Sequence, residues 1–173
     1  MNLPNKLTML RVIAVPVFIV LYLRGMNIAA FAVFILASLT DMLDGKIARK
    51  YNLITDFGKI MDPLADKVLV YSAFCLFIEK GVMPAWMLVV ILAREFIVSG
   101  VRTVAAAGGK VIAAAMSGKI KTVLQMIAVP LLILDTPGVI HTLARIFLWA
   151  SLVMTAVSGA EYVYGNRQLF ADR

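Results

Sequence analysis

The chain has 173 residues, of which 62% are hydrophobic and 16% charged, and its mean hydropathy is +0.92. Soluble domains are closer to half apolar, so this composition argues against an ordinary globular core and indicates one integral membrane domain over residues 1–173. The net charge of +7 suggests an anionic membrane surface and anionic substrates rather than nucleic acid, because basic residues flank apolar segments. A single cysteine, Cys75, excludes an intramolecular disulfide framework and a cysteine zinc site.

The N-terminal segment combines early positive charge with an apolar run, as signal peptides do. It has no A-x-A-like cleavage site, and the next apolar run follows almost at once. We therefore expect a retained first helix over residues 7–23. Arg11 and Pro16 indicate that this helix starts in the membrane interface.

Apolar runs of about 20 residues are long enough to cross a bilayer as helices. In chain order, the sequence predicts six such helices: 7–23, 27–44, 63–79, 83–104, 111–134 and 139–163. The exact start of the fifth is left open, because its first segment is rich in small residues and contains four polar or flexible ones: Ser117, Gly118, Lys119 and Lys121. The predicted fold is therefore an all-α membrane protein with six transmembrane helices.

The basic residues give these helices a direction. With a cytoplasmic N-terminus, one side collects twelve of them: Lys6, Arg11, Lys46, Arg49, Lys50, Lys59, Arg102, Lys110, Lys119, Lys121, Arg167 and Arg173. The other side collects Arg24 and Lys80. This asymmetry predicts a multi-pass protein of the cytoplasmic membrane with both termini inside the cell.

Five of the ten acidic residues fall within 26 positions, from Asp41 to Asp66. Asp41 and Asp44 are three apart at the end of the second apolar run, so they share a helix face. Asp62 and Asp66 are four apart at the start of the third run and also share a face. A helical hairpin turning near residues 51–56 would bring the two pairs together. Small residues on these faces would let helices or a ligand approach closely: Gly45, Ala48 and Gly58.

Four facing carboxylates repel one another, so they either take up protons or bind cations. Oxygen ligands without His or Cys favour hard metals such as Mg²⁺, Mn²⁺ or Ca²⁺. Two divalent ions would balance four charges and would suit displacement at phosphorus. The spacing alone leaves a cation-coupled transporter open. Three acidic residues outside this set are expected to be solvated interface residues: Asp56, Asp135 and Asp172.

The acidic stretch resembles the complete signature of the CDP-alcohol phosphotransferase family, D-x2-D-G-x2-A-R-x8-G-x3-D-x3-D. Every fixed position is filled, by Asp41, Asp44, Gly45, Ala48, Arg49, Gly58, Asp62 and Asp66. The resemblance implies a six-helix membrane enzyme, usually a homodimer. Such an enzyme moves a phosphatidyl group from CDP-diacylglycerol to an alcohol and releases CMP.

Further stretches resemble one branch of this family, the bacterial phosphatidylglycerophosphate synthases. They lie at residues 2–11, 62–67, 93–96, 118–122 and 158–162. This likeness covers nearly the whole chain and implies glycerol 3-phosphate as the acceptor. Inositol phosphate, serine and phosphatidylglycerol are the alternative acceptors within the family.

The resemblance also implies roles for the signature residues. Two Mg²⁺ or Mn²⁺ ions would be held by Asp41, Asp44, Asp62 and Asp66. Asp66 is in addition the expected general base for the acceptor hydroxyl. Contacts with the CDP moiety are expected from Gly45, Ala48, Arg49 and Gly58. Asn5 and Thr8 are further candidates for the nucleotide pocket, with helix N-capping as the competing interpretation.

An acceptor that carries a phosphate needs a second anion site. Arg94 and Arg102 are eight apart on the fourth predicted helix, and Lys119 and Lys121 enter the fifth. These four residues are the predicted acceptor-phosphate site. Anchoring at the cytoplasmic surface is the competing interpretation for Lys121, whereas Arg94 lies too deep for that role, and the neighbouring Glu95 is expected to pair elsewhere.

No catalytic role is expected for the remaining polar and aromatic residues. They are interpreted as interface or packing residues: Trp86, His141, Trp149, Tyr162 and Tyr164. Outside the family, the alternatives are a cation-coupled transporter and a structural scaffold. A transporter needs carboxylates that are accessible from both sides, whereas these all cluster at cytoplasmic helix ends. A scaffold would not need the cluster.

Overall fold

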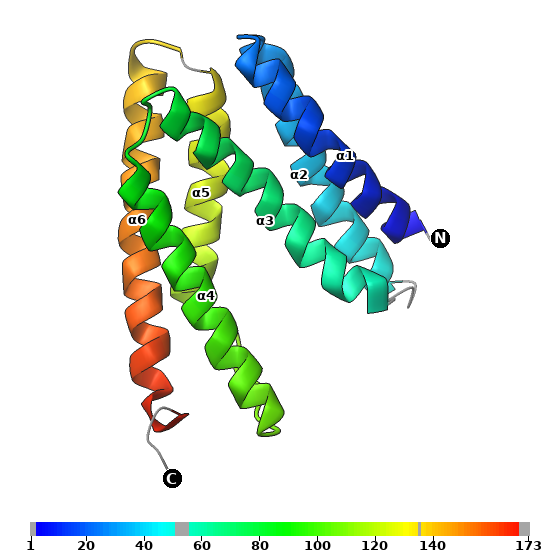
Figure 1. Cartoon of the computed structure of the whole chain (residues 1–173), viewed down its shortest axis with the longest axis vertical. Helices are drawn as coiled ribbons and strands as arrows, with labels where there is room; N and C mark the ends of the chain where they lie inside the picture. The colour runs from blue at the N-terminus through cyan, green and yellow to red at the C-terminus, as the bar shows by residue number, and fades with distance from the viewer. Residues whose placement is uncertain (1–2, 51–55, 135, 170–173) are drawn as a thin grey trace. The chain divides into compact units, whose positions relative to one another are not determined.

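The computed structural model describes the backbone of residues 3–50, 56–134 and 136–169, and the side chains of residues 7–41, 61, 64–134 and 136–168. Within these ranges every regular element is a helix (Figure 1). In chain order they are α1 (Leu3–Leu23), α2 (Asn27–Lys50), α3 (Asp56–Glu79), α4 (Ala85–Ala107), α5 (Met116–Leu134), α6 (Val139–Gly165) and the 3-10 turn η1 (Arg167–Leu169). The prediction of an all-α chain with six helices is confirmed for these residues.

The largest differences from the predicted helix boundaries are at the end of α2 and at the starts of α3 and α5. The helices that carry the acidic signature continue past their apolar runs, so α2 ends at Lys50 and α3 begins at Asp56. The predicted turn thus falls at residues 51–55, outside the described part. The fifth helix begins at Met116 rather than at 111. Gly109 ends the preceding turn with a φ of 73°, a left-handed conformation that suits glycine, and residues 110–115 are not helical.

The helices divide into two compact units. The N-terminal unit contains α1, α2, α3 and the end of α5 from Val129 onward. The C-terminal unit contains α4, the rest of α5 and α6. The expectation of a single domain over residues 1–173 stays a prediction.

In the N-terminal unit, α1 packs against both α2 and α3. Its core is a cluster of aromatic rings in which Phe18 lies 5.8 Å from Phe34, and Tyr22 lies 5.8 Å from Phe77. All four rings are buried. Beyond the end of α3, the ammonium of Lys80 donates to the carbonyl oxygen of Tyr22 at 3.2 Å and lies over its ring. This contact closes the end of the unit opposite the acidic signature.

In the C-terminal unit, α4 and α6 run parallel and pack along their length. Trp86 at the start of α4 meets Trp149 in the first half of α6, with ring centroids 5.9 Å apart. Arg102 meets Tyr162 near the helix ends, where the guanidinium donates to the phenol oxygen at 2.6 Å. The first half of α5 runs antiparallel to α4, so polar residues from all three helices gather where α4 and α6 end and α5 begins.

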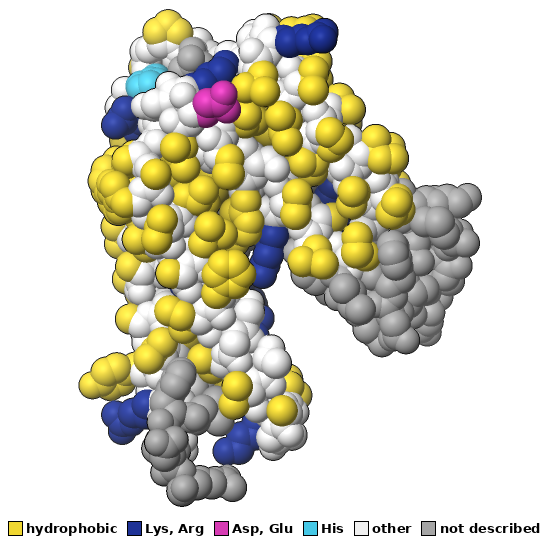
Figure 2. Space-filling view, in the orientation of Figure 1, with side chains coloured by type: hydrophobic (Ala, Val, Ile, Leu, Met, Phe, Trp, Pro, Cys, Tyr) yellow, Lys and Arg dark blue, Asp and Glu magenta, His cyan; other side chains and the backbone are white. Residues whose placement is uncertain are grey.

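Apolar side chains cover much of the outer surface of the helices (Figure 2). Large exposed hydrophobic residues occur on every α-helix, which in water would be an aggregation liability. Among the described residues, Met116–Leu134 and Val139–Gly165 are long and apolar enough to cross a membrane, and shorter apolar segments occur at Leu7–Leu23 and Asn27–Asp41. These features suit a membrane-embedded protein.

The aromatic cluster gives a stability prediction. Phe77→Ala should destabilise the protein by about 3 kcal/mol, because it leaves a cavity among fully buried rings. Phe96→Ala is the matched control, since Phe96 is 72% exposed. Thermal unfolding in detergent would measure both variants, and an equal effect of the two substitutions would contradict the described core.

Candidate functional site

The acidic signature begins beside a buried arginine. Arg11 on α1 is completely buried, and its Nη1 lies 2.6 Å from Oδ1 of Asp41 on α2. Its Nε also donates to the carbonyl oxygen of Ala37 at 3.4 Å. The Asp41 side chain remains 34% exposed. Arg11 therefore orients this carboxylate and leaves part of it accessible, a role that the sequence interpretation of Arg11 as an interface residue missed.

The other signature residues lie on the helices that their spacing predicts. Asp66 is partly buried on α3, next to the buried Ala65. The backbone of the remaining residues is helical, but their side chains lie outside the described set: Asp44, Gly45, Ala48 and Arg49 on α2, and Gly58 and Asp62 on α3. Among the described side chains, which exclude two of the four aspartates, no group of three or more His, Cys, Asp or Glu could hold a metal ion. The four-aspartate site stays a prediction.

Both candidates for the nucleotide pocket on the first helix lie inside it. Because α1 begins at Leu3, neither Asn5 nor Thr8 is its N-cap residue, and the capping interpretation is wrong for both. The side chain of Asn5 lies outside the described set, whereas that of Thr8 is completely buried. Thr8 is three residues before Arg11, so the two buried polar side chains share a face of α1.

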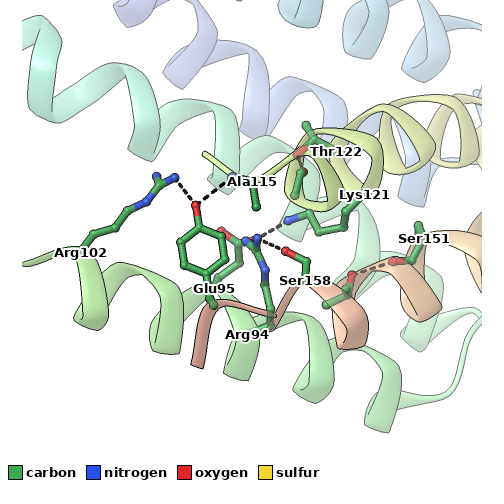
Figure 3. A network of polar contacts seen from close by, with 11 residues as sticks. Arg94, Glu95, Arg102, Ala115, Lys121, Thr122, Ser151 and Ser158 are labelled. Carbon is green, nitrogen blue, oxygen red and sulfur yellow. Dashed lines mark hydrogen bonds and ion pairs between the residues drawn. The ribbon is translucent and has the colours of Figure 1, made fainter. Parts of the chain in front are cut away.

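A second polar cluster lies within the C-terminal unit (Figure 3). Arg94 on α4 donates from Nη1 to Oε1 of Glu95 at 2.8 Å and from Nη2 to Oγ of Ser158 on α6 at 2.5 Å. Lys121 on α5 donates to the same Glu95 oxygen. The exposed fractions of these three charged side chains are 10% for Arg94, 12% for Glu95 and 7% for Lys121. One carboxylate thus holds two buried cations from different helices.

Two glycines create the space that Arg94 occupies. A Cβ atom on Gly118 of α5 would lie 2.8 Å from Arg94 Nη2, which is closer than real Cβ contacts allow. A Cβ atom on Gly159 of α6 would lie 3.1 Å from Arg94 Cγ. The arginine side chain therefore passes between two helix surfaces that are open only because these residues lack side chains.

A third contact group surrounds the hydroxyl of Tyr162 on α6. This hydroxyl accepts from Arg102 Nη2 at 2.6 Å and from the Ala115 amide at 3.2 Å, and it donates to the Ala113 carbonyl at 2.9 Å. Figure 3 labels Arg102 and Ala115, the two residues that donate to this hydroxyl. Tyr162 is 3% exposed. The interpretation of Tyr162 as an interface or packing aromatic is incomplete, because its hydroxyl makes three hydrogen bonds inside the protein.

The structure therefore brings together three of the four predicted acceptor-phosphate residues. Arg94 and Lys121 share Glu95, and Arg102 reaches Tyr162, whose ring lies 5.7 Å from Arg94 Cζ. The surface-anchor interpretation of Lys121 is wrong, because its side chain is buried. Lys119 lies near the start of α5 and is exposed. Close by, Ser117 donates to Glu161.

Sequence reasoning missed several members of this cluster. Its α6 members form a regular stripe in the sequence, and all of them are buried: Ser151, Thr155, Ser158 and Tyr162. Polar residues recurring at helical spacing in an otherwise apolar helix predict a polar inner face. Ser151 and Thr155 use their hydroxyls on the backbone of their own helix, whereas Ser158 and Tyr162 reach the two arginines.

The charges of this cluster suit an anion. Arg94, Arg102 and Lys121 contribute three positive charges, against two from Glu95 and Glu161. Guanidinium groups bind phosphate oxygens through paired hydrogen bonds. The Nε atom of Arg94 is buried and has no hydrogen-bond partner among the described residues, so this guanidinium retains an unused donor.

The shared carboxylate gives a second prediction. Glu95→Gln should destabilise the protein by about 3 kcal/mol, because two buried cations lose their counter-charge. Adding Lys121→Met should recover part of that loss, since one of the two cations is then removed. Thermal unfolding in detergent would measure both variants. Glu79→Gln, an exposed residue at the end of α3, is the control, and a Glu95→Gln variant as stable as this control would contradict the pairing.

Comparison with known proteins identifies the family. The model of the CDP-alcohol phosphatidyltransferase family matches residues 1–157. A Bacillus subtilis protein named CDP-diacylglycerol–glycerol-3-phosphate 3-phosphatidyltransferase is 43% identical over 183 residues, covering 95% of both chains. A Rickettsia typhi protein of the same name is 40% identical over 98% of this chain and 99% of its own. A Mycobacterium tuberculosis protein named probable phosphatidylglycerophosphate synthase is 38% identical over 94% of this chain and 80% of its own. This chain belongs to the CDP-alcohol phosphatidyltransferase family.

Proposed function

We propose that this chain transfers the phosphatidyl group of CDP-diacylglycerol to sn-glycerol 3-phosphate, giving phosphatidylglycerophosphate and CMP. The observation that carries the proposal is the match to relatives named for this reaction along nearly their full length. The complete aspartate signature supports the same chemistry. Membership of an enzyme family argues against the transporter and the scaffold, and neither is proposed.

The C-terminal unit supports the choice of a phosphorylated acceptor. Arg94 and Lys121 are buried and fixed by Glu95, and Arg102 is fixed by Tyr162. Serine carries no phosphate and would offer these cations only the single charge of a carboxylate. We propose that the phosphate of glycerol 3-phosphate binds Arg94, Arg102, Lys119 and Lys121.

The N-terminal unit would bind the donor. Its four aspartates offer only oxygen ligands, in pairs at helical spacing, and this donor set fits two Mg²⁺ or Mn²⁺ ions. Arg11 holds Asp41 in place from the protein side. When bound, such ions would offset the negative charge of the pyrophosphate. The residues that would hold them are Asp41, Asp44, Asp62 and Asp66, and those that would contact the nucleotide are Asn5, Thr8, Gly45, Ala48, Arg49 and Gly58.

The proposed reaction is a direct displacement at phosphorus. Asp66 accepts the proton of the acceptor's C1 hydroxyl as the general base. The C1 oxygen forms a bond to the phosphorus that bears the diacylglycerol, and the bond from this phosphorus to the oxygen of the CMP phosphate breaks. CMP leaves with the bonding electron pair. The arginines and lysines of the acceptor site orient the hydroxyl by fixing the phosphate at the other end of the molecule.

The membrane arrangement completes the proposal. The six helices would each span the cytoplasmic membrane, with both termini and the active site at the cytoplasmic face. The distribution of basic residues supports this orientation. Within each unit the helices alternate in direction, as successive membrane spans do. The expected assembly is a homodimer embedded in membrane lipid.

The proposed reaction predicts release of CMP from CDP-diacylglycerol by the purified protein in lipid–detergent micelles with Mg²⁺. Release should require glycerol 3-phosphate and should be abolished by EDTA and by Asp66→Asn, which removes the proposed base. Inositol phosphate, serine and phosphatidylglycerol are the acceptor controls. Release with one of these instead would keep the family and overturn the acceptor, and no release from folded protein with any acceptor would overturn the proposed function.

The glycine beside Arg94 predicts a separate effect on the acceptor. Gly118→Ala should raise the KM for glycerol 3-phosphate roughly tenfold, because the added Cβ displaces the guanidinium and costs a charged hydrogen bond. Gly100→Ala is the matched control, since a Cβ there meets nothing within 4 Å. Rates of CMP release at varied glycerol 3-phosphate would give both values. Equal KM values for the two variants would count against Arg94 as a phosphate ligand.

A further inference from the structure

Tyr162 connects parts of the C-terminal unit that are distant in the sequence. Its hydroxyl makes three hydrogen bonds, to Arg102 on α4 and to the peptide groups of Ala113 and Ala115 ahead of α5. A phenol hydroxyl has one donor and two acceptor positions, so this set uses its full capacity. A buried hydroxyl satisfied in this way fixes the groups around it.

The ring of Tyr162 also lies beside both arginines of the acceptor site. Its centroid is 5.4 Å from Arg102 Cζ and 5.7 Å from Arg94 Cζ, within the range of cation–π attraction. One side chain thus sets the position of Arg102 relative to Arg94. Ser158, one turn earlier on α6, fixes the second guanidinium with its hydroxyl.

The segment held by Tyr162 leads directly into α5. Residues 110–115 are not helical, although at its two ends the Lys110 amide donates back to the Ala105 carbonyl and the Ala115 carbonyl accepts from the Lys119 amide. The peptide groups between these bonds need partners from outside a helix. The Tyr162 hydroxyl satisfies two of these groups, immediately before α5 begins at Met116. Lys119 and Lys121 follow within the first two turns. Fixing Ala115 therefore also fixes the start of the helix that carries the two lysines.

The cationic side chains of the proposed acceptor site are held by partners of different charge. Arg94 and Lys121 share the carboxylate of Glu95, which offsets part of their charge. Arg102 is held by a neutral phenol, and the described residues contain no ion pair to it. A neutral partner fixes the direction of the guanidinium without cancelling its charge. The full positive charge of Arg102 therefore remains for an anion.

We propose that Tyr162 is a positioning residue for the acceptor's phosphate, acting through Arg102 and the start of α5. This inference rests on the proposed function, because it assumes that Arg102 contacts that phosphate. Tyr162 itself donates its proton to the Ala113 carbonyl and does not touch the substrate. Its loss affects binding of the anionic acceptor and spares the transfer step.

The test compares Tyr162→Phe with Tyr164→Phe, which removes the same hydroxyl from an exposed residue on the same helix. Tyr162→Phe should raise the KM for glycerol 3-phosphate roughly tenfold, the scale of one lost hydrogen bond to a charged group. Its kcat and its KM for CDP-diacylglycerol should stay within about twofold of the parent protein. Inhibition by inorganic phosphate should weaken in the same proportion. Tyr164→Phe should match the parent in every value.

Double substitution then separates positioning from a general loss of structure. In an Arg102→Gln background, Tyr162→Phe should raise the KM for glycerol 3-phosphate much less than it does alone, because the residue that it positions is gone. Equal effects in both backgrounds would overturn the proposal. So would a Tyr162→Phe variant with an unchanged KM, or one that loses kcat and thermal stability together.

These outcomes are distinct from failure of the proposed function. If the parent protein releases no CMP with glycerol 3-phosphate, the proposed function fails and the inference fails with it. If the parent protein is active and Tyr162→Phe behaves like Tyr164→Phe, only the inference fails. Should Tyr162→Phe not fold, Arg102→Gln with its phosphate inhibition still tests the link to the anion, and parent-like inhibition in that variant would overturn the proposal.

Discussion

The C-terminal unit depends on one carboxylate that holds two buried cations. Burial of a charge is costly unless it is paired and hydrogen-bonded, and at membrane depth the cost is larger still. Glu95 meets this requirement for both Arg94 and Lys121. Because the three residues come from α4 and α5, the pairing also fixes how these helices meet. Structural stability and the proposed binding of an anion therefore rest on the same atoms.

The N-terminal unit also pairs a buried charge, but there the roles of the acidic and basic residues are reversed. Arg11 is completely buried and bonded to Asp41 and to the backbone of α2, while the carboxylate stays partly open. In the C-terminal unit the carboxylate of Glu95 holds two basic side chains in place. In the N-terminal unit the guanidinium of Arg11 holds the carboxylate of Asp41 in place. Each arrangement fixes charged side chains before a ligand arrives, which lowers the cost of ordering them on binding.

The sequence predicted most of what depends on periodicity and composition. Apolar runs located six helices, and the spacing of the aspartates placed Asp41 and Asp66 correctly on α2 and α3. The start of α5 was harder to predict, because the partner of the Ala113 carbonyl and the Ala115 amide just before it is Tyr162, some 50 residues later. The burial of Lys121 and the role of Arg11 were missed for the same reason. A pairing partner on another helix depends on the tertiary structure, so it cannot be predicted from the local sequence pattern.

The packing of Arg94 between Gly118 and Gly159 restricts how this site can change over evolution. A larger residue at either glycine position would press on the Arg94 side chain, which would have to move, become shorter, or be given room by a wider separation of the helices. The three positions therefore form one steric unit drawn from α4, α5 and α6. A related chain that differs at one of them would be expected to differ at another, and such paired changes would mark a change in the proposed acceptor site.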